Sequence, residues 1–239
     1  MSSKRVQLLS FLYKEALESG VLADILIERS DDYSRFVVFD YDERFLDGVF
    51  CVKSNHNESV YNFQKGTLDK VVVEKTDCSK FSIDLEFGLV LISGTNKIIT
   101  QFISELGNAL SNRVSIDRID VDWNRIIANT VPHYRIKVKR ARIAEIPIEH
   151  GLLATCTLSF TQDDVESMLL TKYRESLIQL VVTVSADQND NEYDGIDNRD
   201  TVLTIYRSGT IVLNADDDRF SDEQRDLLYA LWNINGRIV

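Results

Sequence analysis

Residues 45–92 read FLDGVFCVKSNHNESVYNFQKGTLDKVVVEKTDCSKFSIDLEFGLVLI, and the fold class is most clearly indicated by these residues. Short runs rich in Val, Ile, Phe and Tyr alternate here with turn-forming pairs such as Ser54-Asn55, Lys65-Gly66 and Thr76-Asp77. The gaps between the runs leave no room for a crossover helix, and parallel neighbours need a connection of about a dozen residues. The pattern therefore predicts an antiparallel meander.

Toward the N-terminus, residues 4–19 have apolar side chains at helical spacing and predict a first helix that ends before Gly20. A second amphipathic helix is predicted from Ile98 to Leu110, with Thr95 or Asn96 as its N-cap. Strands are predicted at 23–29, 35–39, 45–52, 60–63, 70–75, 81–87 and 89–92.

The pattern restarts after Ser111-Asn112, which predicts two sub-domains, 1–112 and 113–239. In the second, strands are predicted at 114–121, 133–143, 152–160, 180–185, 202–206 and 210–213. A helix is predicted at 163–177, and another begins at Ser221, where Gln224 completes a capping box. The predicted fold class is α+β, with antiparallel sheets covered by helices.

The composition is that of a globular protein with an acidic balance. Lys and Arg number 27 against 38 Asp and Glu, a net charge of −11, and 44% of residues are hydrophobic. The longest stretch without a charged residue spans 13 positions, 150–162, whereas a membrane-spanning helix needs roughly 20. We therefore expect no membrane partner and a cytoplasmic location, with Cys51, Cys78 and Cys156 as reduced thiols.

Five cations gather in the eight residues 135–142 of this acidic chain, namely Arg135, Lys137, Lys139, Arg140 and Arg142. Alternation with apolar residues places the first three on one strand face, and Lys139-Arg140 breaks the alternation, which predicts a β-bulge. A basic strand face can contact the phosphates of a nucleic acid. Alternatively, the cations pair with acids on a neighbouring strand or protect a sheet edge from aggregation. Asp117, Asp120 and Asp122 are the candidate acids.

Asp40 and Asp42 follow the apolar strand Val37-Val38-Phe39. Over about ten residues this segment resembles the first motif of haloacid-dehalogenase-type phosphatases. The resemblance implies a metal-dependent phosphohydrolase with Asp40 as nucleophile and Asp42 as acid/base, assisted by Ser93 and by Asp216 or Asp217 as metal partners. Glu43-Arg44 replace the small Gly-Thr pair of that family. A turn built from Asp and Glu between two strands explains the same residues.

The segment 187–200 holds six acids and is similar in composition to a calcium loop. Its closing position is Thr201, where such a loop needs a bidentate Glu, so we expect a mobile loop that is dispensable for stability. The three histidines share no ligand spacing with the cysteines, and we expect no metal site, no cofactor and no catalytic residue.

Residues 201–235 resemble the closing unit of a repeat in the TATA-box-binding-protein fold, in which a strand, a Ser-Gly turn and a second strand lead into a long helix. The sequence departs from that family in having three aspartates, 216–218, before the helix and in lacking paired Phe wedges. Since no coherent catalytic set is present, we expect a non-enzymatic interaction or regulatory subunit that binds a protein partner or a second copy. Nucleic-acid contact through 135–142 is the first alternative and phosphohydrolysis the second.

Overall fold

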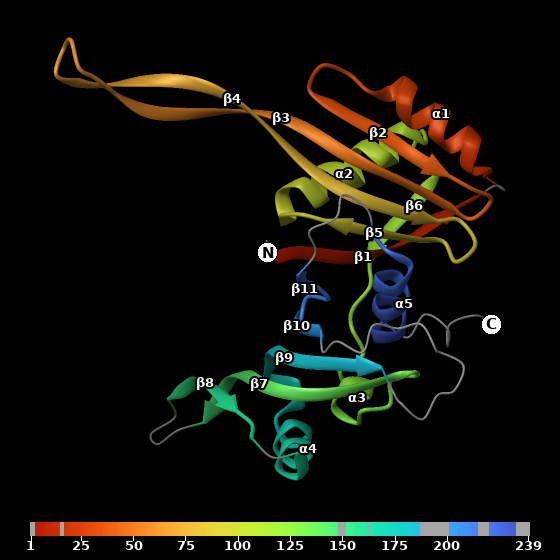
Figure 1. The fold of residues 1–239 in the computed structure, drawn as a ribbon, viewed down its shortest axis with the longest axis vertical. Coiled ribbons are helices and arrows are strands. Elements are labelled where there is room, and N and C mark those ends of the chain that lie inside the picture. The colour runs from red at the N-terminus through yellow and green to blue at the C-terminus, as the bar shows by residue number, and fades with distance from the viewer. Residues whose placement is uncertain are drawn as a thin grey trace. The chain divides into compact units, whose positions relative to one another are not determined.

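The chain forms two compact, sheet-based units in a computed structural model that describes residues 3–14, 17–147, 152–161, 163–186, 201–214 and 220–232 (Figure 1). Unit 1 comprises residues 1–8 and 118–239, and unit 2 comprises residues 9–117. The division thus falls five residues after the expected boundary, and strand β1 (Ser3–Tyr13) contributes its first part to unit 1 and its second part to unit 2.

Unit 2 is a sheet with the strand order β2-β3-β4-β5-β1, and β6 also pairs with β1. The pairs β2–β3, β3–β4 and β4–β5 are antiparallel, as the meander predicts. Its elements are α1 (Ser19–Arg29), β2 (Ser34–Tyr41), β3 (Phe45–Asn62), β4 (Thr67–Asp84), β5 (Leu89–Ser93), α2 (Asn96–Ala109) and β6 (Val114–Arg118).

Four phenylalanine rings form the centre of the unit 2 core. Phe36, Phe50, Phe81 and Phe102 pack with ring centroids 4.8–6.0 Å apart, in tilted and edge-to-face arrangements. Phe102 belongs to α2, whose N-cap Thr95 accepts a hydrogen bond from the backbone N–H of Ile98. This helix and its cap are confirmed.

The first expected helix, residues 4–19, is wrong, because residues 3–13 form strand β1 and the helix α1 begins at Ser19. Four consecutive residues of β1, 6–9, are buried, so the strand is covered on both faces. A short apolar run of this kind cannot be told from a buried helix by periodicity alone. The strand expected at 23–29 is wrong for the same reason, and Leu22 and Leu26 of α1 are buried one helical turn apart.

Strands β3 and β4 form one hairpin of 18 residues on each side, where shorter strands at 45–52, 60–63, 70–75 and 81–87 were expected. Ser54-Asn55 and Thr76-Asp77 do not make turns, because cross-strand pairing continues through them (Ser54↔Lys75, Asn55↔Glu74). The outer part of the hairpin extends beyond the other elements of unit 2 (Figure 1). We call residues 53–76 the arm.

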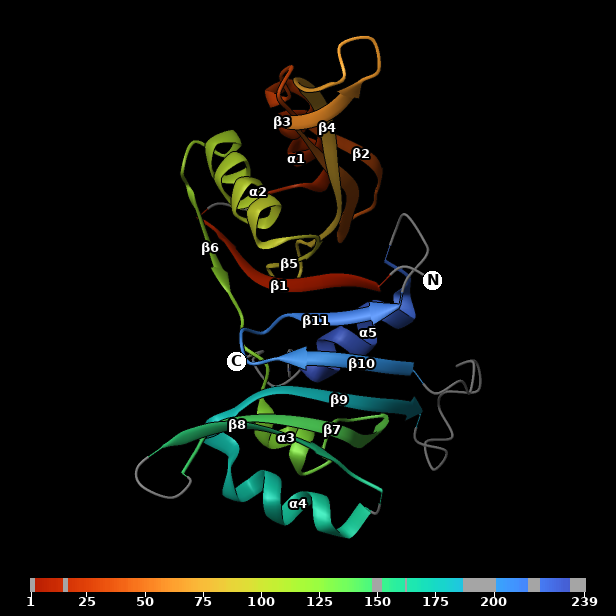
Figure 2. The ribbon, with the colours of Figure 1, turned by 90° about the vertical axis from the view of Figure 1, so that its left-hand side faces the viewer.

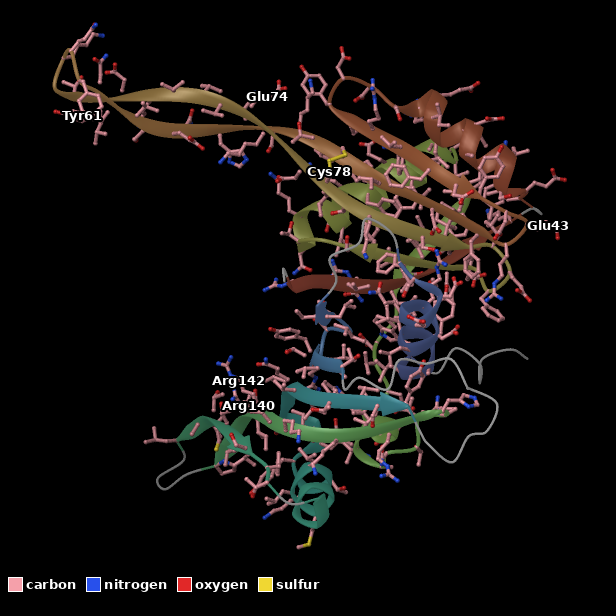
Figure 3. All side chains as sticks on the ribbon, viewed as in Figure 1. Glu43, Tyr61, Glu74, Cys78, Arg140 and Arg142 are labelled. Carbon is pink, nitrogen blue, oxygen red and sulfur yellow. A yellow bond between two sulfur atoms is a disulfide. The ribbon has the colours of Figure 1, made fainter. Side chains whose placement is uncertain are left out.

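Cys51 and Cys78 lie directly opposite each other on β3 and β4 and form a disulfide, with a Cα–Cα distance of 4.1 Å. Figure 3 shows this bond beside the Cys78 label, where the arm leaves the sheet. The expectation of reduced thiols is wrong for Cys51 and Cys78. The sequence did not indicate this disulfide, because the two cysteines are brought together only by the pairing of β3 with β4. Cys156 is a free thiol, as expected.

The strands of unit 1 are antiparallel and have the order β1-β11-β10-β9-β7-β8, in the same 11-stranded sheet as those of unit 2. The capping box at Ser221 is confirmed, since the Ser221 side chain accepts from the Gln224 N–H and the Gln224 side chain accepts from the Ser221 N–H. Besides the first part of β1, the elements of unit 1 are α3 (Trp123–Ile127), β7 (Tyr134–Pro147), β8 (Leu153–Ser159), α4 (Asp163–Lys172), a short 3-10 helix (Arg174–Ser176), β9 (Leu177–Ala186), β10 (Thr201–Tyr206), β11 (Ile211–Asn214) and α5 (Asp222–Leu231).

The two faces of the unit 1 sheet differ in burial. One cross-strand row consists of five side chains that are fully buried, Val6, Ile211, Ile205, Leu180 and Ala141. Helices α3 and α5 lie behind the strands in Figure 2, on one side of the sheet. The opposite face is less buried within the described residues, and it carries the basic residues described below.

No helix in the described part of the chain is long and apolar enough to span a membrane.

Candidate nucleic-acid interface

A bulge in β7 aligns the cations of residues 135–142. The register against β9 pairs Lys137 with Thr183 and then Arg140 with Val181, so Lys139 is the extra residue and has no partner on β9. This is the β-bulge that the broken alternation predicts. The Lys139 carbonyl accepts a hydrogen bond of 3.0 Å from the Phe160 N–H on the other side of the strand.

Because the bulge adds one residue, it returns the side chains after it to the face used before it. Arg135, Lys137, Arg140 and Arg142 stand opposite Ser185, Thr183, Val181 and Gln179, which are alternate residues of β9 and therefore share one face. Ile136 and Val138 before the bulge, and Ala141 and Ile143 after it, all lie on the buried face. A regular strand would have turned Arg140 and Arg142 into the core.

The row that contains Arg140 crosses the whole unit 1 sheet. It runs Arg5, Val212, Thr204, Val181, Arg140, Ser159, from β1 to β8, and each neighbouring pair is directly opposite in the register. None of these six side chains is buried, and Arg5, Arg140 and Ser159 are exposed. We define the basic face as Arg5, Arg135, Lys137, Arg140 and Arg142.

Arg5 is a member that the sequence could not reveal, because residues 4–19 were expected to form a helix. Four strand spacings separate Arg5 on β1 from Arg140 on β7, about 19 Å at about 4.8 Å per strand. The cations are thus spread over the sheet instead of being confined to one strand.

Three cations of the basic face, Arg135, Arg140 and Arg142, and the neighbouring Lys139 have no acidic ion-pair partner among the described residues. On the described strands β1, β7, β8, β9, β10 and β11, Glu145 is the one acid. Arg135, Lys139, Arg140 and Arg142 are exposed. Figure 3 shows the labelled Arg140 and Arg142 on the side of the sheet opposite α5.

The alternative that these cations pair with Asp117, Asp120 or Asp122 on a neighbouring strand is wrong. Asp117 belongs to β6, which pairs with β1, and Asp122 is the N-cap of α3, where its side chain accepts from the Asn124 N–H. The neighbours of β7 are β9 and β8, so it is an internal strand from Arg140 onward, and residues 134–138 pair with β9 alone. The edge-protection alternative therefore does not apply to Arg140 and Arg142.

The two carboxylates of the phosphatase resemblance lie on an antiparallel hairpin. Asp40 is exposed and stands opposite Asp47 of β3. Asp42 holds the turn between the strands, since its Oδ1 accepts from the backbone N–H groups of Arg44 (2.7 Å) and Phe45 (2.6 Å). This is the Asp-built turn that explains the same residues without catalysis.

Ser93, the further residue implied by the phosphatase resemblance, is buried and hydrogen-bonds to the backbone of the neighbouring strand β4. Its hydroxyl accepts from the Lys80 N–H and donates to the Lys80 carbonyl. Asp216 and Asp217, and also the acidic segment 187–200, lie outside the described residues. No cluster of three or more potential metal ligands occurs among the residues that the structure describes.

A shallow hollow of about 250 Å³ in unit 1 is lined by residues of both charges. Arg174 donates to the Asn124 side chain at 2.7 Å, and Arg207 donates to the Glu175 carbonyl. Both guanidinium groups are thus held by structural contacts. Among the described residues that line this hollow, no nucleophile is paired with a base.

Compared with known proteins, the chain matches no family model and no curated sequence.

Proposed function

We propose that the protein is a non-enzymatic binding protein whose unit 1 contacts a nucleic acid through the basic face. The carrying observation is the β7 bulge, which aligns four cations on one sheet face, three of which, Arg135, Arg140 and Arg142, are exposed and have no ion pair with any described residue. The chemistry recognised is the phosphodiester backbone, because arginine and lysine side chains neutralise phosphates and release counterions.

The polar residues between the cations support the same use. Ser159, Thr157 and Thr204 lie on this face and supply hydroxyl groups, and Ser and Thr commonly donate to phosphate oxygens. Among the described strand residues on this face, Tyr206 is the one tyrosine. Because base stacking relies on aromatic side chains, contact with the phosphodiester backbone is favoured over base stacking.

The net charge of −11 does not prevent this binding at physiological salt. Charges farther than the Debye length of about 8 Å are largely screened, so the local excess of cations governs the last approach. At low salt the acidic remainder of the protein repels the polyanion over longer distances.

The resemblance of residues 201–235 to a repeat of the TATA-box-binding-protein fold also supports the proposal, because proteins of that family bind DNA through a sheet. In this chain the matching segment supplies β10 and β11 of the unit 1 sheet.

The test is a binding measurement over a salt series with duplex DNA, single-stranded DNA and RNA. The variant Arg135→Gln/Arg140→Gln/Arg142→Gln removes three phosphate contacts. The slope of log affinity against log salt should flatten by about 2.7 on duplex DNA and about 2.1 on single strands. The melting temperature should stay unchanged, because the three side chains are exposed and make no ion pair with the described residues.

The matched control is Lys14→Gln/Lys97→Gln/Arg118→Gln, which changes the net charge equally at exposed positions off the basic face. It should keep the wild-type salt slope. Absence of wild-type binding to all three nucleic acids at about 50 mM salt refutes the proposal, and so does an equal loss of affinity in the control.

The expected cytoplasmic location stays a prediction, and the disulfide favours a non-reducing compartment instead. Trapping the thiols in intact cells and counting the modified cysteines by mass spectrometry distinguishes the two. One modified cysteine indicates an oxidising compartment, and three indicate a reducing one.

A further inference from the structure

The arm, residues 53–76, carries large apolar side chains that are exposed. Phe63 at its tip is 90% exposed, Leu68 67% and Val72 64%. Tyr61, labelled near the end of the arm in Figure 3, packs edge-to-face on Phe63 with ring centroids 5.0 Å apart. An isolated two-stranded ribbon is marginally stable in water, so the arm would gain from a further strand.

One edge of the arm is open along its length within the described residues. β5 pairs with β4 only at Phe81–Asp84, which leaves Thr67–Ser79 without a strand on that side. We call Thr67–Asp77, which reads TLDKVVVEKTD, the β4 edge. Three consecutive valines give it high β-propensity at its centre.

The β4 edge is complementary to itself. When two copies pair antiparallel about a two-fold axis at Val72, Lys70 of each copy stands opposite Glu74 of the other. Asp69 then stands opposite Lys75, and Val71 opposite Val73. Directly opposite side chains in antiparallel strands have Cβ atoms about 4.5–5.5 Å apart, within reach of such charge pairs.

Neighbouring registers lose this match. A two-fold axis at Val73 places Asp69 opposite Asp77 of the other copy, and an axis at Val71 places Asp69 opposite Val73 and Glu74 opposite Leu68. The outer edge of β3 offers no comparable pattern, because Glu58 is the one acid or base between Ser54 and Asn62 other than His56. The match is therefore specific to one register of one edge.

The backbone of β4 also directs free hydrogen-bonding groups toward this edge. The short Cα–Cα distance of 4.1 Å at Cys51–Cys78 marks a pair without mutual hydrogen bonds. Pairs alternate along the ladder, so the even-numbered residues from Leu68 to Thr76 direct their N–H and C=O groups outward. An axis at Val72 sets even residues opposite even residues and provides about ten backbone hydrogen bonds.

Asp69, Glu74 and Lys75 already have a charged partner within the arm, and Asp69 lies 3.9 Å from Lys65. Glu74 lies 3.2 Å from Lys53 and Lys75 lies 2.7 Å from Glu58, both across the hairpin. Lys70 is exposed and has no ion pair with any described residue. In the paired arrangement, Glu74 of the second copy would be the partner of Lys70.

We propose that two copies of this chain associate through the β4 edge, forming a four-stranded antiparallel ribbon in the order β3-β4-β4-β3 with the two-fold axis at Val72. The interface is isologous, since Lys70 contacts Glu74 and Glu74 contacts Lys70. The proposal is independent of nucleic-acid binding.

Analytical ultracentrifugation of the full chain over a concentration series tests this association. The wild type should dimerise, and Lys70→Glu should weaken the dimer about tenfold or more, because it sets like charges opposite each other twice. Lys97→Glu makes the same charge change on α2 and should leave the dimer constant unchanged. A wild type that stays monomeric at all concentrations overturns the proposal.

Mixing the variants tests the register. Glu74→Lys should also weaken the homodimer, whereas an equimolar mixture of Lys70→Glu and Glu74→Lys chains restores opposite charges at both positions and should form heterodimers. Failure of the mixture to associate, while the two single variants keep wild-type circular dichroism, overturns the proposed pairing.

A cysteine introduced at Val72 tests the position of the two-fold axis. In a Cys156→Ser background, Val72→Cys faces its own copy and should cross-link into a covalent dimer under oxidised glutathione. Val71→Cys faces Val73 and should cross-link far less. Equal cross-linking of both, or binding of the arm to lipid vesicles by a protein that stays monomeric, contradicts the proposal.

Discussion

Breaking the disulfide Cys51–Cys78 should lower the free energy of unfolding by about 3.5 kcal/mol. The two cysteines are separated by 27 positions in the sequence, and closing a loop of that length removes about 12 cal/mol/K from the entropy of the unfolded chain. The folded state loses little, because the hairpin pairing on both sides of the bond is retained (Val52↔Asp77, Phe50↔Ser79).

Urea unfolding of the wild type and of Cys51→Ser/Cys78→Ser, followed by far-UV circular dichroism, measures this difference. At a slope of about 2 kcal/mol per molar, the midpoint should fall by about 1.7 M. Tryptophan fluorescence is unsuitable for unit 2, because Trp123 and Trp232 both belong to unit 1. Cys156→Ser is the control and should shift the midpoint little. Coincident curves for the wild type and the double variant would refute the loop-entropy reasoning.

Three further predictions follow from the packing, a helix cap and an ion pair. Phe102→Ala should cost about 3–5 kcal/mol in equilibrium unfolding, because the ring is fully buried among three others, and a loss below about 1 kcal/mol would contradict that packing. Ser221→Ala should cost about 1 kcal/mol through loss of the capping box, with Ser221→Thr retaining most of it. The hydrogen bond and charge of Lys75 lower the pKa of Glu58, so the stabilisation is present above the unfolded-state pKa and lost as the pH falls through the folded-state pKa. NMR titration should show the lowered Glu58 midpoint return to its ordinary value in Lys75→Ala.

Local signals in the sequence correctly predicted several parts of the fold. Thr95 and Ser221 are helix caps that bond to backbone groups within three residues, so their effect is encoded locally. The antiparallel meander follows from connections too short for a helix. The bulge at Lys139 is visible in the sequence because one extra residue shifts the alternation of apolar and basic side chains.

Strand β1 carries no local sequence signal of this kind, because its buried residues point to both faces of the sheet. Residues 6–9 of β1 are apolar or uncharged throughout and are all buried, and this removes the period of two on which a strand prediction rests. The helix expected there, and the strand expected at α1, were wrong because burial depends on neighbours distant in the sequence.

Three features of the proposed sites were decided by the tertiary structure. Pairing of β3 with β4 brings Cys51 to Cys78, the β1–β11 register brings Arg5 to the face of Arg140, and the end of β5 at Ser93 leaves the β4 edge open. Each depends on strand order and register, which are set by contacts between distant segments. The basic residues, the apolar residues and the helix caps can be read from the amino-acid sequence. Which of them share a face or an edge follows from the three-dimensional pairing, because a strand acquires its neighbours through long-range contacts.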